Sequence, residues 1–204
     1  MNLPNKLTIF RVLLVVLMLI VSVCSSLNQD IPIRELRYII NVKDLILLAI
    51  FIIASITDCL DGYFARKNNQ ITTFGKFLDP IADKILVLTA LIILVAEGKI
   101  PAWIPCIIMI REFVVSGYRL VIVEKNGEVI AANMWGKIKT VSQIFAIGFC
   151  FVDMYKFGQF FTNVQGLLGI IINVITTTLM AVSVIATIIS GAIYLKDWKK
   201  VILE

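Results

Sequence analysis

Six long apolar stretches dominate this chain of 204 residues and restrict what it can fold into. Hydrophobic residues make up 59% of the sequence, and the mean hydropathy is +0.94. A soluble domain has about half apolar and about a quarter charged residues, whereas a helix that crosses a bilayer needs about 20 mostly apolar residues. The sequence therefore predicts an all-α, polytopic integral membrane protein with six transmembrane helices, at about residues 7–27, 44–64, 80–97, 101–123, 138–155 and 165–195.

The connections between these stretches are short, so residues 1–204 are expected to form a single membrane domain without a separate soluble unit. The segment from Asn28 to Lys43 is expected to be an external loop with a short helical piece. Residues 68–70 and 97–101 are expected to be polar turns, the second of them external. The last apolar stretch is long enough to tilt or to extend past the membrane surface.

Basic residues are distributed unevenly between the two sides of the predicted bundle. If the six spans alternate in direction, most of the 19 lysines and arginines fall on the side that holds both termini and the connection from Ala65 to Asp79. Lysine and arginine accumulate in cytoplasmic loops of membrane proteins. The sequence therefore predicts a multi-pass protein of the plasma membrane whose termini and 65–79 connection face the cytoplasm.

Two of the predicted spans carry a group of four aspartates, Asp58, Asp61, Asp79 and Asp83. Acids inside a membrane are costly and mark functional sites. At about 100° per residue, the first two share one helical stripe and the last two share a face of the next helix. Two antiparallel helices joined by a short turn can aim all four at one point, where they would repel one another unless a cation lies between them.

Carboxylate oxygens are hard ligands that suit Mg²⁺, Mn²⁺ or Ca²⁺. The chain contains no histidine, so a carboxylate is also the candidate general base. The aspartates therefore predict a site for one or two divalent ions in a polar cavity that faces the cytoplasm.

Small residues accompany the aspartates. Gly62, Ala65 and Gly75 remove side chains at positions where a nucleotide or a diphosphate must approach the backbone. The alternative is close packing of small residues between helices. Arg66 suits either a phosphate of the substrate or a lipid headgroup, and its position does not choose between them.

The pattern Asp58-x2-Asp61-Gly62-x2-Ala65-Arg66-x8-Gly75-x3-Asp79-x3-Asp83 resembles the signature of the CDP-alcohol phosphatidyltransferases, with every signature residue present. The opening segment from Asn2 to Arg11 also resembles the start of the bacterial phosphatidylglycerophosphate synthases in that family. The resemblance implies a homodimer that uses Mg²⁺ or Mn²⁺. In the implied reaction, an alcohol attacks a phosphorus of a CDP-linked lipid and CMP is released. It implies metal ligands and a general base among the aspartates and a CDP-lipid site among the small residues. The metal ligands would be Asp58, Asp61, Asp79 and Asp83, with Asp83 also the base, and Gly62, Ala65, Arg66 and Gly75 would line the cytidine diphosphate site.

Four basic residues are candidates for binding the attacking alcohol: Arg111 and Arg119 in the fourth span, and Lys137 and Lys139 at the start of the fifth. Arginine inside a span is costly unless it lines a polar cavity, and guanidinium groups match the geometry of a phosphate. These residues are expected to bind a phosphorylated acceptor. The alternative is that Arg111 pairs with Glu112 or Glu124 while the lysines only follow the charge bias of the membrane.

The N-terminal segment has two interpretations. Asn5 and Thr8 can begin a helix, with Arg11 as an interfacial anchor. Alternatively, this turn lies over the nucleotide and closes the CDP-lipid site, which the resemblance favours for Asn5 and Thr8.

The acceptor segments, Arg111 to Arg119 and Gly136 to Thr140, resemble the glycerol-phosphate enzymes of the family. The expected reaction is therefore transfer of the phosphatidyl group of CDP-diacylglycerol to sn-glycerol 3-phosphate, which gives phosphatidylglycerol phosphate and CMP. Inositol phosphate or another alcohol is the nearer alternative acceptor, and a polytopic cation transporter is the remote alternative, because intramembrane acids are expected there too. Membrane lipids, but no nucleic acid, are expected as partners.

Overall fold

The computed structural model describes residues 3–33, 38–67, 73–126, 134–160 and 166–202, with the backbone alone for part of several helices. Within these ranges it contains six α-helices, so each of the six apolar stretches is confirmed as helical. The helices are α1 (Leu3–Val23), α2 (Val42–Lys67), α3 (Thr73–Ala96), α4 (Trp103–Asn126), α5 (Met134–Val152) and α6 (Leu167–Ile202). The predicted turn at residues 68–70 lies outside the described residues.

A short β-hairpin joins α1 to α2, where the sequence predicted a loop with a helical piece. Strands β1 (Asp30–Ile33) and β2 (Tyr38–Asn41) pair antiparallel, with Asp30 opposite Asn41. The prediction was wrong because isoleucine and tyrosine favour strands, and a two-stranded sheet tolerates Pro32 on its outer edge. The one helical piece nearby in the described residues is a 3₁₀ turn, Ser25–Leu27, which precedes the hairpin.

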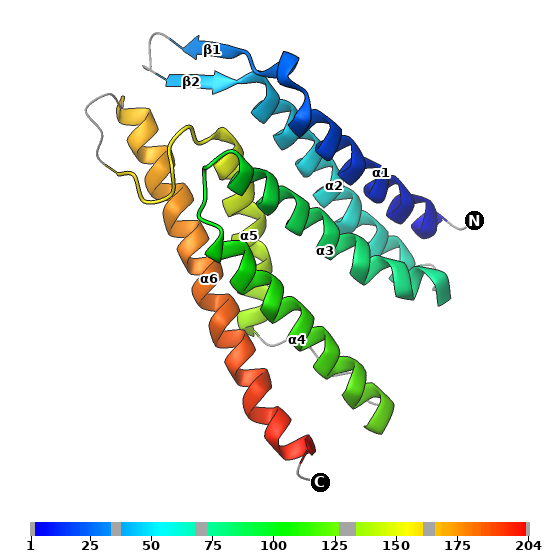
Figure 1. Ribbon diagram of the computed structural model, residues 1–204. Helices are drawn as coiled ribbons and strands as arrows, with labels where there is room; N and C mark the ends of the chain where they lie inside the picture. Colours follow the sequence, from blue (N-terminus) through cyan, green and yellow to red (C-terminus); the bar gives the residue numbers. More distant parts are fainter. Residues whose placement is uncertain (1–2, 34–37, 68–72, 127–133, 161–165, 203–204) are drawn as a thin grey trace.

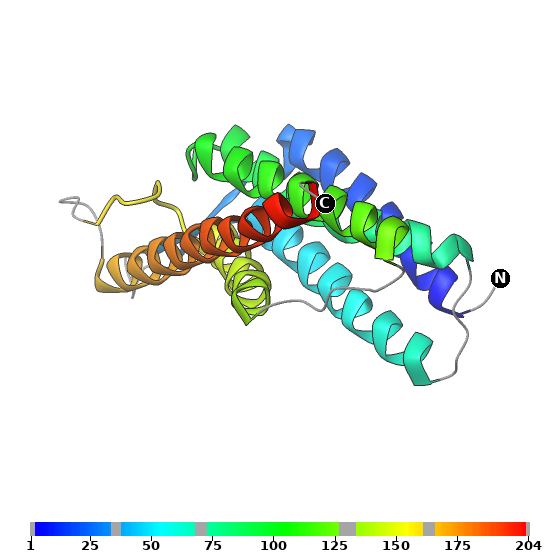
Figure 2. The same cartoon turned by 90° about the horizontal axis from the view of Figure 1, so that it is seen from below.

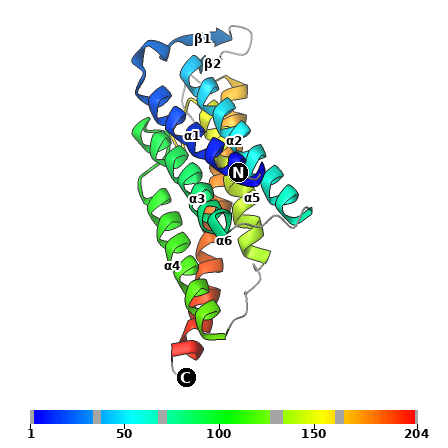
Figure 3. The ribbon, with the colours of Figure 1, turned by 90° about the vertical axis from the view of Figure 1, so that its right-hand side faces the viewer.

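The six helices form two groups that pack side by side (Figure 1). Helix α1 packs against α2 and α3, α6 packs against α5 and α4, and α2 contacts α5 between the groups. Figures 1 and 2 both show that the start of α1, the end of α2 and the start of α3 lie at one end of the molecule, here called the motif end. The β-hairpin lies at the opposite end in Figure 1, here called the hairpin end, and Figure 3 shows it at the top of the molecule.

Helix α6 buries several of its polar residues and exposes several of its apolar ones. Asn173, Ser183 and Ser190 are fully buried, whereas Ile185 and Ile188 are more than half exposed. The hydroxyl of buried Thr187 donates to the carbonyl of Ser183 at 2.6 Å, so this hydroxyl is satisfied within its own helix. Small polar residues let neighbouring helices approach closely in membrane proteins, and α6 uses them against α5 and α4.

One helix among the described residues is long and apolar enough to cross a membrane by length and composition: residues Leu167–Tyr194 of α6, with a mean hydropathy of 2.2. Leu7–Val23 and Lys84–Ala96 are shorter apolar helices. Helix α4 carries Arg111 and Glu112 in its middle, which lowers its hydropathy.

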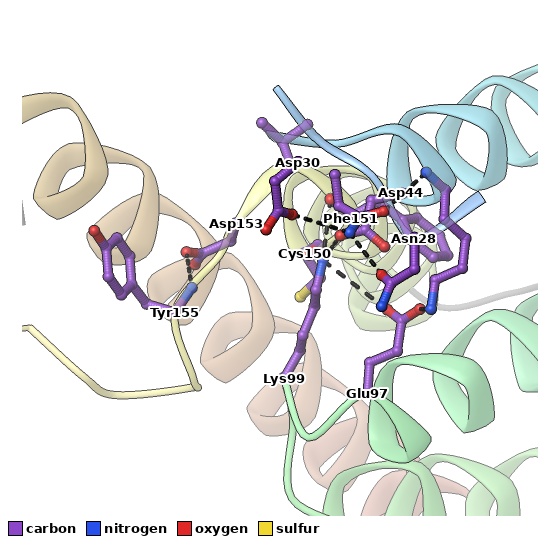
Figure 4. A network of polar contacts seen from close by, with 12 residues as sticks. Asn28, Asp30, Asp44, Glu97, Lys99, Cys150, Phe151, Asp153 and Tyr155 are labelled. Atoms are coloured by element: carbon purple, nitrogen blue, oxygen red, sulfur yellow. Dashed lines mark hydrogen bonds and ion pairs between the residues drawn. The ribbon is translucent and has the colours of Figure 1, made fainter. Parts of the chain in front are cut away.

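Buried charges tie the hairpin end together (Figure 4). Lys99 lies in the turn between α3 and α4, where Gly98 has a φ of 70° that favours glycine, so a turn at the predicted place is confirmed. The Lys99 ammonium contacts Asp44 at the start of α2 at 2.7 Å and donates to the carbonyls of Cys150 and Phe151, both at 3.1 Å, at the end of α5. A single side chain thus joins the ends of three helices.

Two carboxyl groups at the hairpin end have raised pKa values. Burial, followed by the charge of Asp44, raises the pKa of Glu97, and the ion pair with Lys43 at 3.0 Å only partly opposes this. Burial also raises the pKa of Asp153, although that carboxylate accepts a hydrogen bond from the Tyr155 amide at 2.9 Å. Both groups therefore favour the protonated form more than they would in water.

Candidate active site

The signature residues lie on α2 and α3 at the motif end. Asp58, Asp61, Gly62, Ala65 and Arg66 belong to the last turns of α2, and Gly75, Asp79 and Asp83 to the first half of α3. Of these residues the structure describes the side chain of Asp58 alone. Convergence of the four carboxylates on a metal therefore stays a prediction, as does the lining of a nucleotide site by the small residues.

Arg11 of α1 makes an ion pair with the first signature aspartate. Its Nη1 atom lies 2.6 Å from the nearer carboxylate oxygen of Asp58. The Arg11 side chain is 0% exposed and that of Asp58 is 43% exposed. The interpretation of Arg11 as an interfacial anchor was wrong, because an anchor would reach water, whereas this guanidinium is enclosed between helices.

Thr8 precedes Arg11 by one turn and is also buried, with 1% of its surface exposed. Residues three apart share a helix face, so α1 presents both to the interior of the bundle. Asn5 belongs to the first turns of α1, and its side chain lies outside the described residues. The N-terminal helix therefore reaches the signature directly through Arg11, while contacts of Asn5 and Thr8 with a nucleotide remain predicted.

A cavity of about 290 Å³ lies between α3, α4 and α5. Its charged lining residues are three cations, Lys84, Arg111 and Lys139, and one carboxylate, Glu112. The remaining lining residues are Val87, Leu88, Ile108, Val115, Ser116, Gly136, Thr140, Gln143 and Ile144. An excess of cations in a cavity between helices suits an anionic ligand, because partly buried charges are screened less than charges at a surface.

Arg111 is held from two sides. Its Nη1 atom lies 3.0 Å from an oxygen of Glu112, so the alternative pairing considered from the sequence is confirmed as a contact. Its Nη2 atom donates to the hydroxyl of Ser190, and its guanidinium lies 5.9 Å from the ring centre of Tyr194, both on α6. A Cβ atom on Gly191 would lie 3.3 Å from Cγ of Arg111, so the glycine leaves room for the arginine stem.

Lys139 approaches the same carboxylate from α5. Its ammonium donates to the Glu112 oxygen that also contacts Arg111, and the residue is 6% exposed. The structure thus brings Arg111 and Lys139 together in one cavity wall. Lys137 is exposed and does not line the cavity, and the side chain of Arg119 lies outside the described residues.

Sequence reasoning missed two cavity residues. Lys84 follows Asp83 directly on α3, and its ammonium donates to the hydroxyl of Ser116 on α4. Gln143 lies four residues after Lys139 on α5, which places it on the same helix face. That four-residue spacing could have identified Gln143 from the sequence. Lys84 could not be identified in this way, because it looked like one more of the basic residues that accumulate on the cytoplasmic side.

A second cavity, of about 540 Å³, is an apolar groove between α2 and α5. Leu48, Phe51 and Ile52 line it on one side, and Phe145 and Phe149 on the other. Ser55 and Ile56 also line the groove, within one turn of Asp58. The groove therefore leads along α2 to the signature.

Comparison with known proteins places this sequence in a family. The CDP-alcohol phosphatidyltransferase profile matches residues 1–189. The chain is 48% identical over 153 residues to the CDP-diacylglycerol–glycerol-3-phosphate 3-phosphatidyltransferase of Bacillus subtilis, covering 72% of this chain and 74% of the relative. The Haemophilus influenzae protein of that name is 42% identical over 151 residues, 72% of this chain and 74% of the relative. The one from Rickettsia felis is 34% identical over 203 residues, 98% of this chain and 96% of the relative. The chain belongs to the CDP-alcohol phosphatidyltransferase family.

Proposed function

We propose that this chain transfers the phosphatidyl group of CDP-diacylglycerol to sn-glycerol 3-phosphate and releases CMP. The observation that carries the proposal is the cation-lined cavity, whose Lys84 adjoins Asp83 of the signature. The names of the three relatives support the same donor and acceptor. A phosphorylated acceptor fits this cavity better than serine or choline, because three cations face one carboxylate there.

The proposed acceptor contacts are Arg111, Lys139 and Lys84, joined by Arg119 and Lys137 from adjoining turns. Arginine binds a phosphate through two parallel hydrogen bonds, and lysine adds a point charge. With the phosphate held between α4 and α5, the free 1-hydroxyl of the acceptor extends toward the signature on α3. Asp83 accepts the proton of that hydroxyl.

The oxygen of the 1-hydroxyl forms a bond to the phosphatidyl phosphorus as the bond from that phosphorus to the CMP oxygen breaks. Asn5, Thr8, Gly62, Ala65, Arg66 and Gly75 are the proposed contacts of the cytidine diphosphate. Arg11 orients the Asp58 carboxylate through the ion pair at 2.6 Å, because its guanidinium is held in the interior of the bundle.

A divalent ion, Mg²⁺ or Mn²⁺, is the proposed cofactor, with one or two ions bound. Asp58, Asp61, Asp79 and Asp83 would hold it, and the donor set fits, since carboxylate oxygens are the ligands such ions prefer. When bound, the metal neutralises charge on the diphosphate and on the departing CMP.

We propose that residues 1–204 form one domain whose six helices all cross the plasma membrane, with the motif end facing the cytoplasm. Large apolar side chains that point outward on α1, α4 and α6 support this, among them Leu13, Ile110 and Ile185, each more than half exposed. Exposed apolar surface of this extent suits lipid or a second protein. The family resemblance supports a homodimer.

The apolar groove between α2 and α5 supports a lipid donor. Its lining is almost entirely hydrocarbon, and it runs to within one turn of Asp58. We propose that an acyl chain of CDP-diacylglycerol lies there while the diphosphate reaches the signature. Gly148 in its wall would meet Leu48 at 3.7 Å if it carried a Cβ atom, so larger residues at that position would narrow the groove.

The test is CMP release by the purified protein in mixed micelles with CDP-diacylglycerol. Glycerol 3-phosphate, inositol phosphate and serine are offered in parallel, with Mg²⁺ present or chelated. We expect turnover with glycerol 3-phosphate that stops on chelation and returns with metal. Activity with serine alone would contradict the phosphate cavity, and a folded Asp83→Asn variant with near-normal turnover would remove Asp83 from the base role.

A further inference from the structure

Gln143 is a buried polar residue that the proposed mechanism does not use. It lies on α5, it is 2% exposed, and it lines the cation-rich cavity. Its side-chain nitrogen has no hydrogen-bond partner among the described residues. A buried amide nitrogen without a partner is unfavourable, and because the residue lines a cavity, a bound ligand is the candidate partner.

Another buried amide in the same protein is used differently. Asn173 is fully buried, and its side-chain nitrogen donates to the Asp153 carboxylate at 2.9 Å and to the Lys156 carbonyl at 3.1 Å. That nitrogen has a structural role and is satisfied without any ligand. The Asn173 amide nitrogen is thus paired within the protein, whereas the Gln143 amide nitrogen is not.

The position of Gln143 relates it to the phosphate contacts. Gly136, Lys139, Thr140 and Gln143 follow the spacing of one helix face, and all four line the cavity. Arg111 and Glu112 lie in the same cavity wall on α4. The glutamine therefore adds a neutral donor one turn further along α5 than Lys139.

We propose that the side-chain amide of Gln143 donates a hydrogen bond to a phosphate oxygen of the acceptor. This inference rests on the proposed function. A phosphate dianion has three terminal oxygens and accepts several hydrogen bonds at once. Glu112 contacts both Arg111 and Lys139, whereas the Gln143 amide nitrogen has no partner among the described residues. Gln143 can therefore add a hydrogen bond without breaking an existing contact.

The test compares Gln143→Met, which keeps the length but loses the donor, with Gln143→Glu, which places a carboxylate beside the phosphate. KM is measured for glycerol 3-phosphate and for CDP-diacylglycerol, and inorganic phosphate is titrated as a competitive inhibitor. In Gln143→Met we expect the KM for glycerol 3-phosphate and the Ki of phosphate to rise together, by about 10- to 100-fold, the usual range for loss of a hydrogen bond to a charged group. Gln143→Glu should raise both further. The KM for CDP-diacylglycerol and kcat should change little.

Ser142→Ala is the matched control. Ser142 is the neighbouring buried residue on α5, its hydroxyl donates to the Lys139 carbonyl at 3.1 Å, and it does not line the cavity. A rise in the KM for glycerol 3-phosphate with an unchanged Ki for phosphate would overturn the proposal, because Gln143 would then contact a hydroxyl. Equal loss with both substrates in the Gln143 variants, or the same change in the control, would indicate a structural role and also overturn it.

The wild-type protein separates this inference from the proposed function. If it does not use glycerol 3-phosphate, the proposed function fails and the inference fails with it. If it does, and phosphate inhibits the wild type and the Gln143 variants equally, only the inference fails. Should Gln143→Glu not fold, Gln143→Met decides the outcome by itself.

Discussion

Ser190 offers a test of how α6 positions the acceptor site without lining the cavity. Its hydroxyl accepts a hydrogen bond from Nη2 of Arg111, and the residue is fully buried. Ser190→Ala removes the acceptor but keeps the helix and nearly the same volume. We expect Arg111 to lose the orientation in which it meets a phosphate, because water does not replace the hydroxyl at a buried position.

The size of the expected loss in acceptor binding follows from the contacts that Arg111 retains in Ser190→Ala. A hydrogen bond to a charged group contributes about 1.5–3 kcal/mol. Arg111 retains Glu112 at 3.0 Å and the Tyr194 ring at 5.9 Å, so the loss in acceptor binding should be smaller, about 1–2 kcal/mol. Since 1.4 kcal/mol is a factor of ten, the KM for glycerol 3-phosphate should rise by about 5- to 30-fold. The KM for CDP-diacylglycerol and kcat should stay nearly unchanged, as for an interaction made equally in the bound and transition states.

The assay is steady-state CMP release with each substrate varied in turn. Thr187→Val is the matched control, because Thr187 is equally buried one turn earlier on α6 and its hydroxyl bonds within the helix. Gly191→Ala should act in the same direction as Ser190→Ala, since its Cβ would press on the Arg111 stem at 3.3 Å. An unchanged acceptor KM in Ser190→Ala, or an equal change in Thr187→Val, would refute the argument.

Three further predictions concern other parts of the molecule. Arg11→Met should lower stability by about 2 kcal/mol, less than the loss of a fully buried pair because Asp58 is half exposed; thermal unfolding in detergent measures this, and Arg11→Lys should lose less. Lys84→Met removes a cavity cation and its hydrogen bond to Ser116. It should raise the KM for glycerol 3-phosphate by about tenfold, the order expected for one charged hydrogen bond. An equal rise in the KM for CDP-diacylglycerol would argue against an acceptor contact. Glu97 has a raised pKa in the folded protein. Its contribution to stability is therefore complete below the ordinary glutamate pKa of about 4.3 and is lost as pH rises through the folded pKa. Glu97→Gln should flatten the decline of melting temperature above about pH 4, and identical pH profiles of the variant and the wild type would contradict this.

The helices could be predicted from sequence because each apolar stretch is long and its neighbours are polar. The β-hairpin could not be predicted, because Ile31, Ile33 and Ile39 lie in segments too short to show the two-residue period of a strand. Charged residues nearby made the segment look like a loop. The sequence also did not show which side of each helix packs against the other helices. A membrane helix can be apolar on both faces, so composition does not tell which of its residues face another helix.

The same limit explains the site. The spacing of the aspartates predicted two helices with aligned acids, and Arg111 and Lys139 were selected because cations inside spans need partners. Sequence could not show that Arg11 faces Asp58, because that contact depends on how α1 packs against α2. It also could not show that Gln143 lacks a partner, which is a property of the assembled cavity.

The contacts of Lys99 at the hairpin end constrain the order in which the chain can assemble during synthesis. The carbonyls that its ammonium reaches lie 51 and 52 residues later in the sequence, at the end of α5. When α3 and the turn after it emerge, Asp44 is already available, but those carbonyls do not yet exist. Until the fifth helix is made, the Lys99 ammonium can therefore contact Asp44 but not the two carbonyls. The full set of contacts at the hairpin end forms only after the fifth helix has been translated and has entered the bundle.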